Sequence, residues 1–244
     1  MIDPAMKRLD MTTVGAICAL ATVASFAIGI VFMATSGVQV LIPETGKDAL
    51  DWIADVDDAG GAFFVGAWLV ILGGYFGLVA LVGFYFALRD AGPVMILGPI
   101  LGAVGLTLVQ ISHLIPIGMA YELVPDYVHA SGATQASIAS TADTLAILAL
   151  VVNYTGNVLN WGVVVPLYAI AILKTGALPR WIGWLGLATA VLAGWLGLLG
   201  PVSGVIEGIS SIGFFLFFVF MAAMGVALLR RRSAEPKAMP ATVL

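Results

Sequence analysis

The chain has 244 residues, of which 61% are hydrophobic and only 10% are charged, and its formal net charge is −4. A soluble globular domain is about half apolar and about a quarter charged, so this composition excludes one. A mean hydropathy of +1.08 indicates an integral membrane protein instead.

The first apolar stretch runs from about Val14 to Ala34 and follows Lys7 and Arg8. It is long enough to cross a bilayer as a helix, which takes about 20 residues. A cleaved secretory signal has a shorter apolar region, of about 7–15 residues, and a cleavage site of small residues after it. We therefore expect this helix to be retained. Met6 is an alternative start, in which case residues 1–5 are not native.

Five further stretches are long and apolar enough to span a membrane, at about residues 61–88, 93–117, 144–173, 181–199 and 205–229. Backbone groups in lipid must form their hydrogen bonds within the segment, and these runs are too continuously apolar for barrel strands. The predicted fold is all-α: a polytopic transmembrane bundle of six helices. It forms one domain over residues 1–232, followed by a short tail, 233–244.

Basic residues separate almost completely between the two sets of connections. One set consists of the N-terminus, the turn at Arg89, the turn from Lys174 to Arg180, and the tail, and it holds every basic residue except Lys47. Loops rich in Lys and Arg stay on the cytoplasmic side. The pattern therefore predicts that both termini are cytoplasmic.

Acidic residues gather on the opposite, outer side, most densely before the second span. Asp48, Asp51 and Asp55 share one helical face, while Trp52 and Ile53 supply an apolar side. This periodicity predicts a short amphipathic helix on the outer surface. An acidic outer face repels nucleic acid, so we expect no nucleic-acid partner.

The same segment holds weak candidates for a calcium site, Asp55, Asp57 and Asp58. Their spacing resembles the start of an EF-hand loop, but Gly66 stands where that loop needs its final glutamate. The alternative is a solvated acidic face.

The connection between the third and fourth spans is long, from Gly118 to about Ala142. It mixes aromatic and acidic residues with His129, which we expect to be exposed. Candidate N-caps for the fourth helix are Ser137, Ser140 and Thr141.

Polar side chains recur at helical spacing inside three of the spans. The third span carries Thr107, Gln110 and His113, the fourth carries Asn153, Asn157 and Asn160 with Asp143 on the same seam, and the sixth opens with Glu207, Ser210 and Ser211. Such groups are costly in lipid and therefore face protein or a cavity. We predict a ligand-binding cleft, open to the outer face and lined by Gln110, His113, Asp143, Asn153, Asn157 and Glu207.

Two alternatives remain open for these residues. The asparagines can serve only to hold helices together by hydrogen bonds, and His113 can be a packed, satisfied histidine. His113 is also a weak catalytic candidate, as an acid or base beside Asp143 or Glu207. Glycines spaced by four, such as Gly73 and Gly77, are typical of close helix contacts within or between chains.

The sequence excludes several chemistries. With one cysteine, Cys18, the chain has no intramolecular disulfide or redox pair, and with two histidines a dedicated zinc site is not expected. No lysine within a span can anchor retinal, and the phosphate-binding, nucleophile-elbow and zinc-protease motifs are missing from the sequence. We expect no cofactor.

The segments Asn153-Tyr154-Thr155-Gly156-Asn157 and Leu178-Pro179-Arg180-Trp181-Ile182-Gly183 carry a resemblance. They resemble a large bacterial family of small six-helix membrane proteins that is known only as a domain of unknown function. The resemblance implies a polar fourth helix, a short basic turn and a glycine-rich fifth helix, in a bacterial cytoplasmic membrane. It implies no activity.

These patterns favour a non-enzymatic protein that binds a small or lipidic molecule in the outer cleft, or that serves as a subunit of a membrane complex. Its expected partners are membrane lipids and either further copies of the chain or a larger complex. The first alternative is a transporter or channel for a small solute or ion, although no three-plus-three repeat is evident. The second is an intramembrane enzyme.

Overall fold

The computed structural model describes residues 10–38, 41–43, 47–202 and 204–234, without the side chains of residues 47–49, 200–202, 207 and 232–234. Every regular element in these ranges is helical. Six helices are long and apolar enough to cross a membrane, over Met11–Thr35, Gly61–Ala91, Pro93–His129, Gly132–Thr175, Arg180–Leu199 and Gly204–Arg231. The prediction of an all-helical, multi-pass protein is thereby confirmed.

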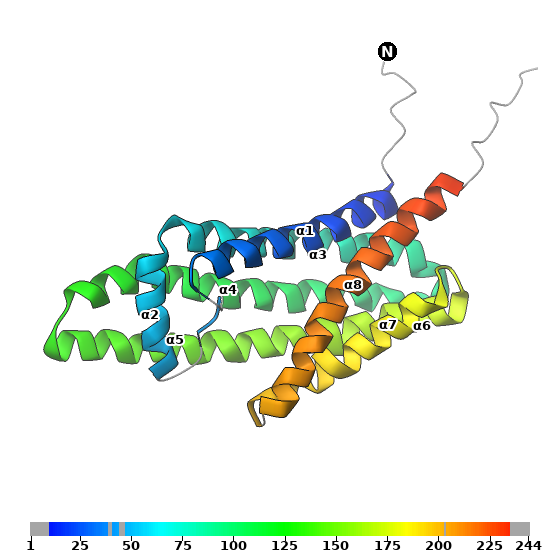
Figure 1. The fold of residues 1–244 in the computed structure, drawn as a ribbon. Coiled ribbons are helices and arrows are strands. Elements are labelled where there is room, and N and C mark those ends of the chain that lie inside the picture. The colour runs from blue at the N-terminus through cyan, green and yellow to red at the C-terminus, as the bar shows by residue number, and fades with distance from the viewer. Residues whose placement is uncertain (1–9, 39–40, 44–46, 203, 235–244) are drawn as a thin grey trace, which may run out of the picture.

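The elements follow one another as an up-and-down bundle (Figure 1). They are α1 (Met11–Thr35), α2 (Lys47–Ala59), α3 (Gly61–Leu88), η1 (Arg89–Ala91), η2 (Pro93–Ile96), α4 (Leu97–His129), α5 (Gly132–Asn157), η3 (Val158–Val164), α6 (Val165–Thr175), α7 (Arg180–Thr189), η4 (Ala190–Trp195), η5 (Gly197–Val202) and α8 (Gly204–Ala234). We call the end that carries the start of α1 and the close of α8 the terminal end. The opposite end, with α2 and the α4–α5 turn, is the α2 end.

The long connection predicted for residues 118–142 is wrong. Helix α4 continues to His129 and α5 begins at Gly132, so only Ala130 and Ser131 join them. Ser137, Ser140 and Thr141 are inside α5, where the Thr141 hydroxyl donates to the Ser137 carbonyl at 3.0 Å instead of capping the helix. At 33 residues α4 is about 50 Å long, well beyond the hydrocarbon thickness. The sequence prediction ended the third span at its polar residues, whereas α4 and α5 continue as helices through these residues.

Helix α1 is fixed by a cap at its start and by glycine contacts along its length. The Asp10 carboxylate accepts a hydrogen bond from Thr13 N at 2.7 Å. Along the helix, Gly15 faces Gly83 and Gly29 faces Gly66 so closely that a Cβ on any of them would meet backbone atoms of the neighbouring helix. The helices α1 and α3 therefore pack backbone to backbone.

Glycines spaced by four residues differ in their surroundings. Gly73 packs on Phe26 of α1, and Gly98 and Gly102 pack on Tyr168 and Leu81. In contrast, no atom of the described residues lies within 4 Å of where a Cβ on Gly204 or Gly208 of α8 would be.

Helix α2 lies across the α2 end of the bundle (Figure 1). Its apolar residues Trp52, Ile53 and Val56 are buried, and the Trp52 ring meets Phe63 of α3 edge-on at 5.8 Å between centroids. Its acidic residues Asp51, Asp55, Asp57 and Asp58 are exposed. The helix thus packs on protein with one face and presents carboxylates with the other.

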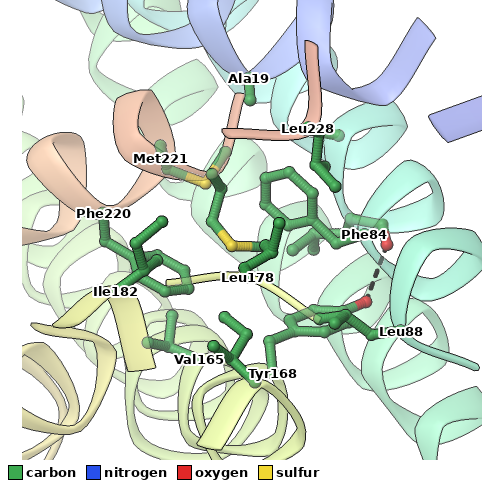
Figure 2. Packing of buried hydrophobic residues seen from close by; sticks show 14 of the residues in the cluster. Ala19, Phe84, Leu88, Val165, Tyr168, Leu178, Ile182, Phe220, Met221 and Leu228 are labelled. Atoms are coloured by element: carbon green, nitrogen blue, oxygen red, sulfur yellow. Dashed lines mark hydrogen bonds between the residues drawn. The ribbon is translucent and has the colours of Figure 1, made fainter. Parts of the chain in front are cut away.

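Large side chains fill the terminal end. Figure 2 shows Phe84 and Leu88 of α3, Tyr168 of α6 and Met221 of α8 packed together. The Tyr168 hydroxyl donates to the Leu81 carbonyl at 2.8 Å, and the Phe84 and Tyr168 rings meet edge-on. Because this cluster is buried and its hydroxyl is satisfied, it closes the bundle at that end.

Candidate functional site

A cavity of about 580 Å³ lies within the bundle, a size typical of ligand sites. It exists because α8 changes partners along its length: Gly213 packs against Ala193 of η4, whereas Gly225 packs against Ala16 of α1. From the terminal end toward the α2 end, α8 therefore moves away from α1. The space left is lined from α1, α3, α4, α5, η3, η4 and α8.

One wall of the cavity is polar and includes three of the six residues predicted to line the cleft. His113 of α4 lies beside Asn153 and Asn157 of α5 in this lining. Asn157 Nδ2 donates to Asn153 Oδ1 at 2.7 Å, and Asn153 Nδ2 donates to Ser112 Oγ at 2.9 Å. The Ser112 hydroxyl in turn donates to the Val109 carbonyl at 2.7 Å. Asn153 thus joins α4 to α5, as the packing alternative expected.

Several polar atoms beside this chain of hydrogen bonds are buried and have no partner among the described residues. They are Nδ1 of His113, Oδ1 of Asn160, and both Nε2 and Oε1 of Gln110. His113 is 9% exposed and Asn160 is 5% exposed, and both line the cavity. An unsatisfied buried polar group costs about 1–3 kcal/mol, so these atoms lower the stability of the bundle around the cavity. Each of them is almost inaccessible, so they do not themselves face the cavity.

Gln110 is buried but is not among the lining residues, contrary to its predicted place on the wall. Its amide fills the notch at Gly74 of α3, where a Cβ would overlap Nε2. Gly74 itself lines the cavity. The glutamine amide therefore lies behind the polar wall.

Two wide helical turns shape the side of the cavity opposite α1. The segments η3 and η4 are π-helical, and they pack against each other where Gly194 approaches Gly162, with a Cβ on Gly194 lying 2.5 Å from Gly162 N. The turn η3 brings Asn160 and Trp161 into the lining. Wide turns of this kind are frequent at functional sites.

The wall facing the polar residues is aromatic. Trp161 lies 5.8 Å from Phe214 and 5.7 Å from Phe217 between ring centroids, and Phe26 of α1 lies 5.1 Å from Phe218. All five rings line the cavity. The site therefore has a hydrogen-bonding side and an apolar side, the arrangement that an amphiphilic molecule needs.

The floor of the cavity is apolar, and its exposed rim combines apolar residues with Ser210 and Ser211 of α8. Toward the terminal end the lining consists of Leu81, Val164 and Met221, which belong to the closed cluster of Figure 2. At the rim, Ile30 is 42% exposed and Phe215 is 66% exposed. The cavity is thus blind at the terminal end and open along a flank between α1 and α8.

The other predicted site residues lie apart from the cavity. Asp143 is half-buried near the α2 end of α5, has an interaction of its own, and does not line the cavity. The side chain of Glu207 is outside the described residues. The calcium candidates Asp55, Asp57 and Asp58 lie within the last turns of α2 and not in a loop. In the described ranges, no group of three or more His, Cys, Asp or Glu side chains could hold a metal ion.

No known protein family, curated protein or solved structure matches the chain. The site itself is therefore the basis for any functional proposal.

Sequence reasoning placed Asn160 in the polar series but left it out of the predicted cleft, and it missed Trp161 and the phenylalanines of α8. Asn160 follows Asn157 by three residues, but only the wide turn η3 shows how both reach one cavity. The phenylalanines offered a clearer signal, because Phe214, Phe217 and Phe218 are three and four residues apart and so share one helical face.

Proposed function

We propose that this chain is a multi-pass membrane protein that binds a small or lipidic molecule in the cavity between α1, α5 and α8. The observation that carries the proposal is that polar side chains, His113, Asn153 and Asn157, and five aromatic rings line one cavity inside the bundle. The apolar rim residues Ile30 and Phe215 support entry from the lipid phase, because these side chains would face acyl chains in a bilayer.

The closed terminal end favours binding over transport. A transporter needs a polar route that can be opened to both faces, and its sites are commonly built from broken helices. Here the polar wall stops at Leu81, Val164 and Met221, and beyond them lie Phe84 and Tyr168 at 0% exposure.

The arrangement gives less support to an enzyme. A general acid–base needs an orienting partner within hydrogen-bond reach. His113 Nδ1 has none among the described residues. Of its two proposed carboxylates, Asp143 is not in the cavity lining, and the side chain of Glu207 is outside the described residues.

A subunit role is the second candidate, favoured by one feature of α8. Gly204 and Gly208 have no neighbour within 4 Å in the described part of the chain, while Val205 is 74% exposed and Ile212 is 56% exposed on the same helix. Small residues beside exposed apolar ones allow close packing of a second transmembrane helix.

Native mass spectrometry of protein extracted gently with its lipids tests the proposal. We expect one specific molecule bound to each chain, lost in His113→Leu but kept in Leu114→Ala, whose side chain is on the exposed side of α4. A chain that carries only bulk lipid but retains a stoichiometric protein partner would contradict binding and support the subunit role.

We further propose a bacterial cytoplasmic membrane as the location, with both termini cytoplasmic. The support is the distribution of basic residues, since Lys174 and Arg180 are at the turn of the terminal end and the exposed carboxylates of α2 are at the other end. In a Cys18→Ser background, an impermeant maleimide applied to intact spheroplasts should label Asp55→Cys and spare Lys174→Cys. The reverse labelling would contradict this orientation.

A further inference from the structure

The chain of hydrogen bonds on the polar wall has a direction, and that direction is set at Ser112. The Ser112 hydroxyl has one hydrogen, which it donates at 2.7 Å to the Val109 carbonyl, a group that can only accept. Toward Asn153 the hydroxyl can therefore only accept, so the group of Asn153 that lies 2.9 Å away must be its amide nitrogen. The orientation of the Asn153 amide follows from this chemistry.

The same reasoning extends to Asn157, one turn further along α5. Asn153 Oδ1 can only accept, so Asn157 donates to it through Nδ2, at 2.7 Å. Asn157 Oδ1 is then the last atom of the chain, and it forms no hydrogen bond with any described residue. Hydrogen bonds in series polarise one another, which strengthens the acceptor at the end of such a chain.

Asn157 Oδ1 differs from the enclosed atoms Oδ1 of Asn160 and Nδ1 of His113. It is not one of the buried atoms that lack a partner, so it is accessible, and Asn157 is a half-buried residue that lines the cavity. The second ring nitrogen of His113, Nε2, is accessible by the same reasoning and has no partner among the described residues. The polar wall therefore presents an acceptor and a ring nitrogen.

These two atoms define the kind of head group that fits the wall. Asn157 Oδ1 is satisfied only by a ligand that donates an O–H or N–H. Ethers, esters and ketones can only accept, so they would leave this oxygen unmet and cut off from water. A hydroxyl can donate to Asn157 and also meet His113 Nε2, which donates or accepts according to its tautomer.

The apolar part of such a ligand has a separate place. The rings of Trp161, Phe214 and Phe217 pack against one another and line the cavity. An alkyl chain can lie on these rings while the donating group reaches Asn157.

We propose that Asn157 selects the head group of the ligand. Its Oδ1 accepts a hydrogen bond from the bound molecule, so the cavity holds lipid alcohols, such as a monoacylglycerol or a fatty alcohol, in preference to ethers with the same tail. This inference rests on the proposed binding function, and it names the residue and the chemical group that decide which amphiphile is bound.

The test uses two competitors that differ only at the donated hydrogen. Radiolabelled monoolein is bound to the purified, delipidated protein in detergent, and unlabelled oleyl alcohol or oleyl methyl ether competes for it. We expect one displaceable monoolein per chain and competition about tenfold stronger by the alcohol than by the ether. Equal or stronger competition by the ether would overturn the selection of donors while leaving the binding function intact. Absence of displaceable binding of both labelled monoolein and labelled ether would contradict both.

Two variants locate the selection. Asn157→Leu removes the acceptor and keeps a side chain of similar size, so the alcohol and the ether should compete about equally. The control Leu114→Ala, on the exposed side of α4, should keep the tenfold preference. Thermal unfolding of each variant, followed by reaction of Cys18 with a thiol-reactive dye, checks that it is folded. A tenfold preference that persists in a folded Asn157→Leu would overturn the role of this residue, and the two competitors on the parent chain test donor selection without any variant.

Discussion

The two ends of the bundle are built from the same kind of helix but differ in how their interior is filled. At the terminal end, Phe84, Tyr168 and Met221 interlock, and the one hydroxyl drawn in Figure 2 is bonded to a carbonyl. Toward the α2 end, the helices enclose a cavity lined in part by His113 and Asn160, each of which has a buried atom with no partner among the described residues. Around the cavity the side chains do not fill the interior, and some buried polar atoms lack a hydrogen-bond partner among the described residues.

The difference has a local cause. Glycines bring α1 and α3 into backbone contact along their length, which leaves no gap between them. The π-helical turns η3 and η4 instead pack tightly on each other at Gly162 and Gly194, while α8 follows η4 away from α1. Natural proteins keep such departures from good packing mainly where function requires them.

The largest effect is expected for a glycine of the α1–α3 contact. Gly83→Leu forces side-chain atoms into the backbone of α1 at Gly15 and should lower the unfolding free energy by roughly 3 kcal/mol. The matched control, Gly208→Leu, has open space and should change it by less than about 0.5 kcal/mol. Denaturant titration in detergent, read by the dye reaction of Cys18, measures both. Equal losses of unfolding free energy in the two variants would show that α8 is closely packed at Gly208, as α3 is against α1 at Gly83.

A smaller effect of opposite sign is expected behind the polar wall. Gln110→Leu replaces two unpartnered buried atoms with an apolar side chain of similar size, so it should stabilise the delipidated protein by about 1–2 kcal/mol. We expect the same variant to bind monoolein as the parent chain does, because Gln110 does not line the cavity. Destabilisation on the same assay would contradict the view that these atoms are unsatisfied in the free protein.

The smallest effect is expected for the satisfied hydroxyl at the terminal end. Tyr168→Phe removes the bond to the Leu81 carbonyl and should destabilise the protein by about 1 kcal/mol, with no change in monoolein binding. Thermal unfolding measures the stability of this variant, and binding of radiolabelled monoolein measures its ligand affinity. Both are compared with the values for Gln110→Leu. A loss of binding would mean that the closed cluster and the cavity are coupled.

The overall architecture was predictable because membrane spans follow from length and hydropathy alone. The spans at 61–88 and 205–229 agree with helices α3 and α8 to within a few residues. The extent of α4 was not predictable, since its polar part beyond Gly118 remains helical by pairing with α5.

The cavity was predictable only in part. The spacing of Asn153 and Asn157 indicated a shared face, and both residues line the cavity with His113. The π-helical turns η3 and η4, which form another part of the cavity wall, have no repeating residue pattern that would predict them. One signal was present, because Pro166 lacks the N–H that would bond to the Gly162 carbonyl, directly at the end of η3. Gln110 and Asp143 recur at the same helical spacing as the lining residues, but they do not line the cavity. Which polar residues line it depends on how the helices pack, and the spacing does not give that.

The most direct test of a ligand site in this cavity is photocrosslinking with an oleyl alcohol that carries a diazirine in its tail. After illumination in detergent, proteolysis and mass spectrometry locate the label. We predict labelling of α8 and η3 around Phe214, Phe217 and Trp161, suppressed by excess monoolein. Labelling spread over exposed faces, such as Ile100 of α4 and Trp184 of α7, and insensitive to monoolein would contradict a ligand site in this cavity.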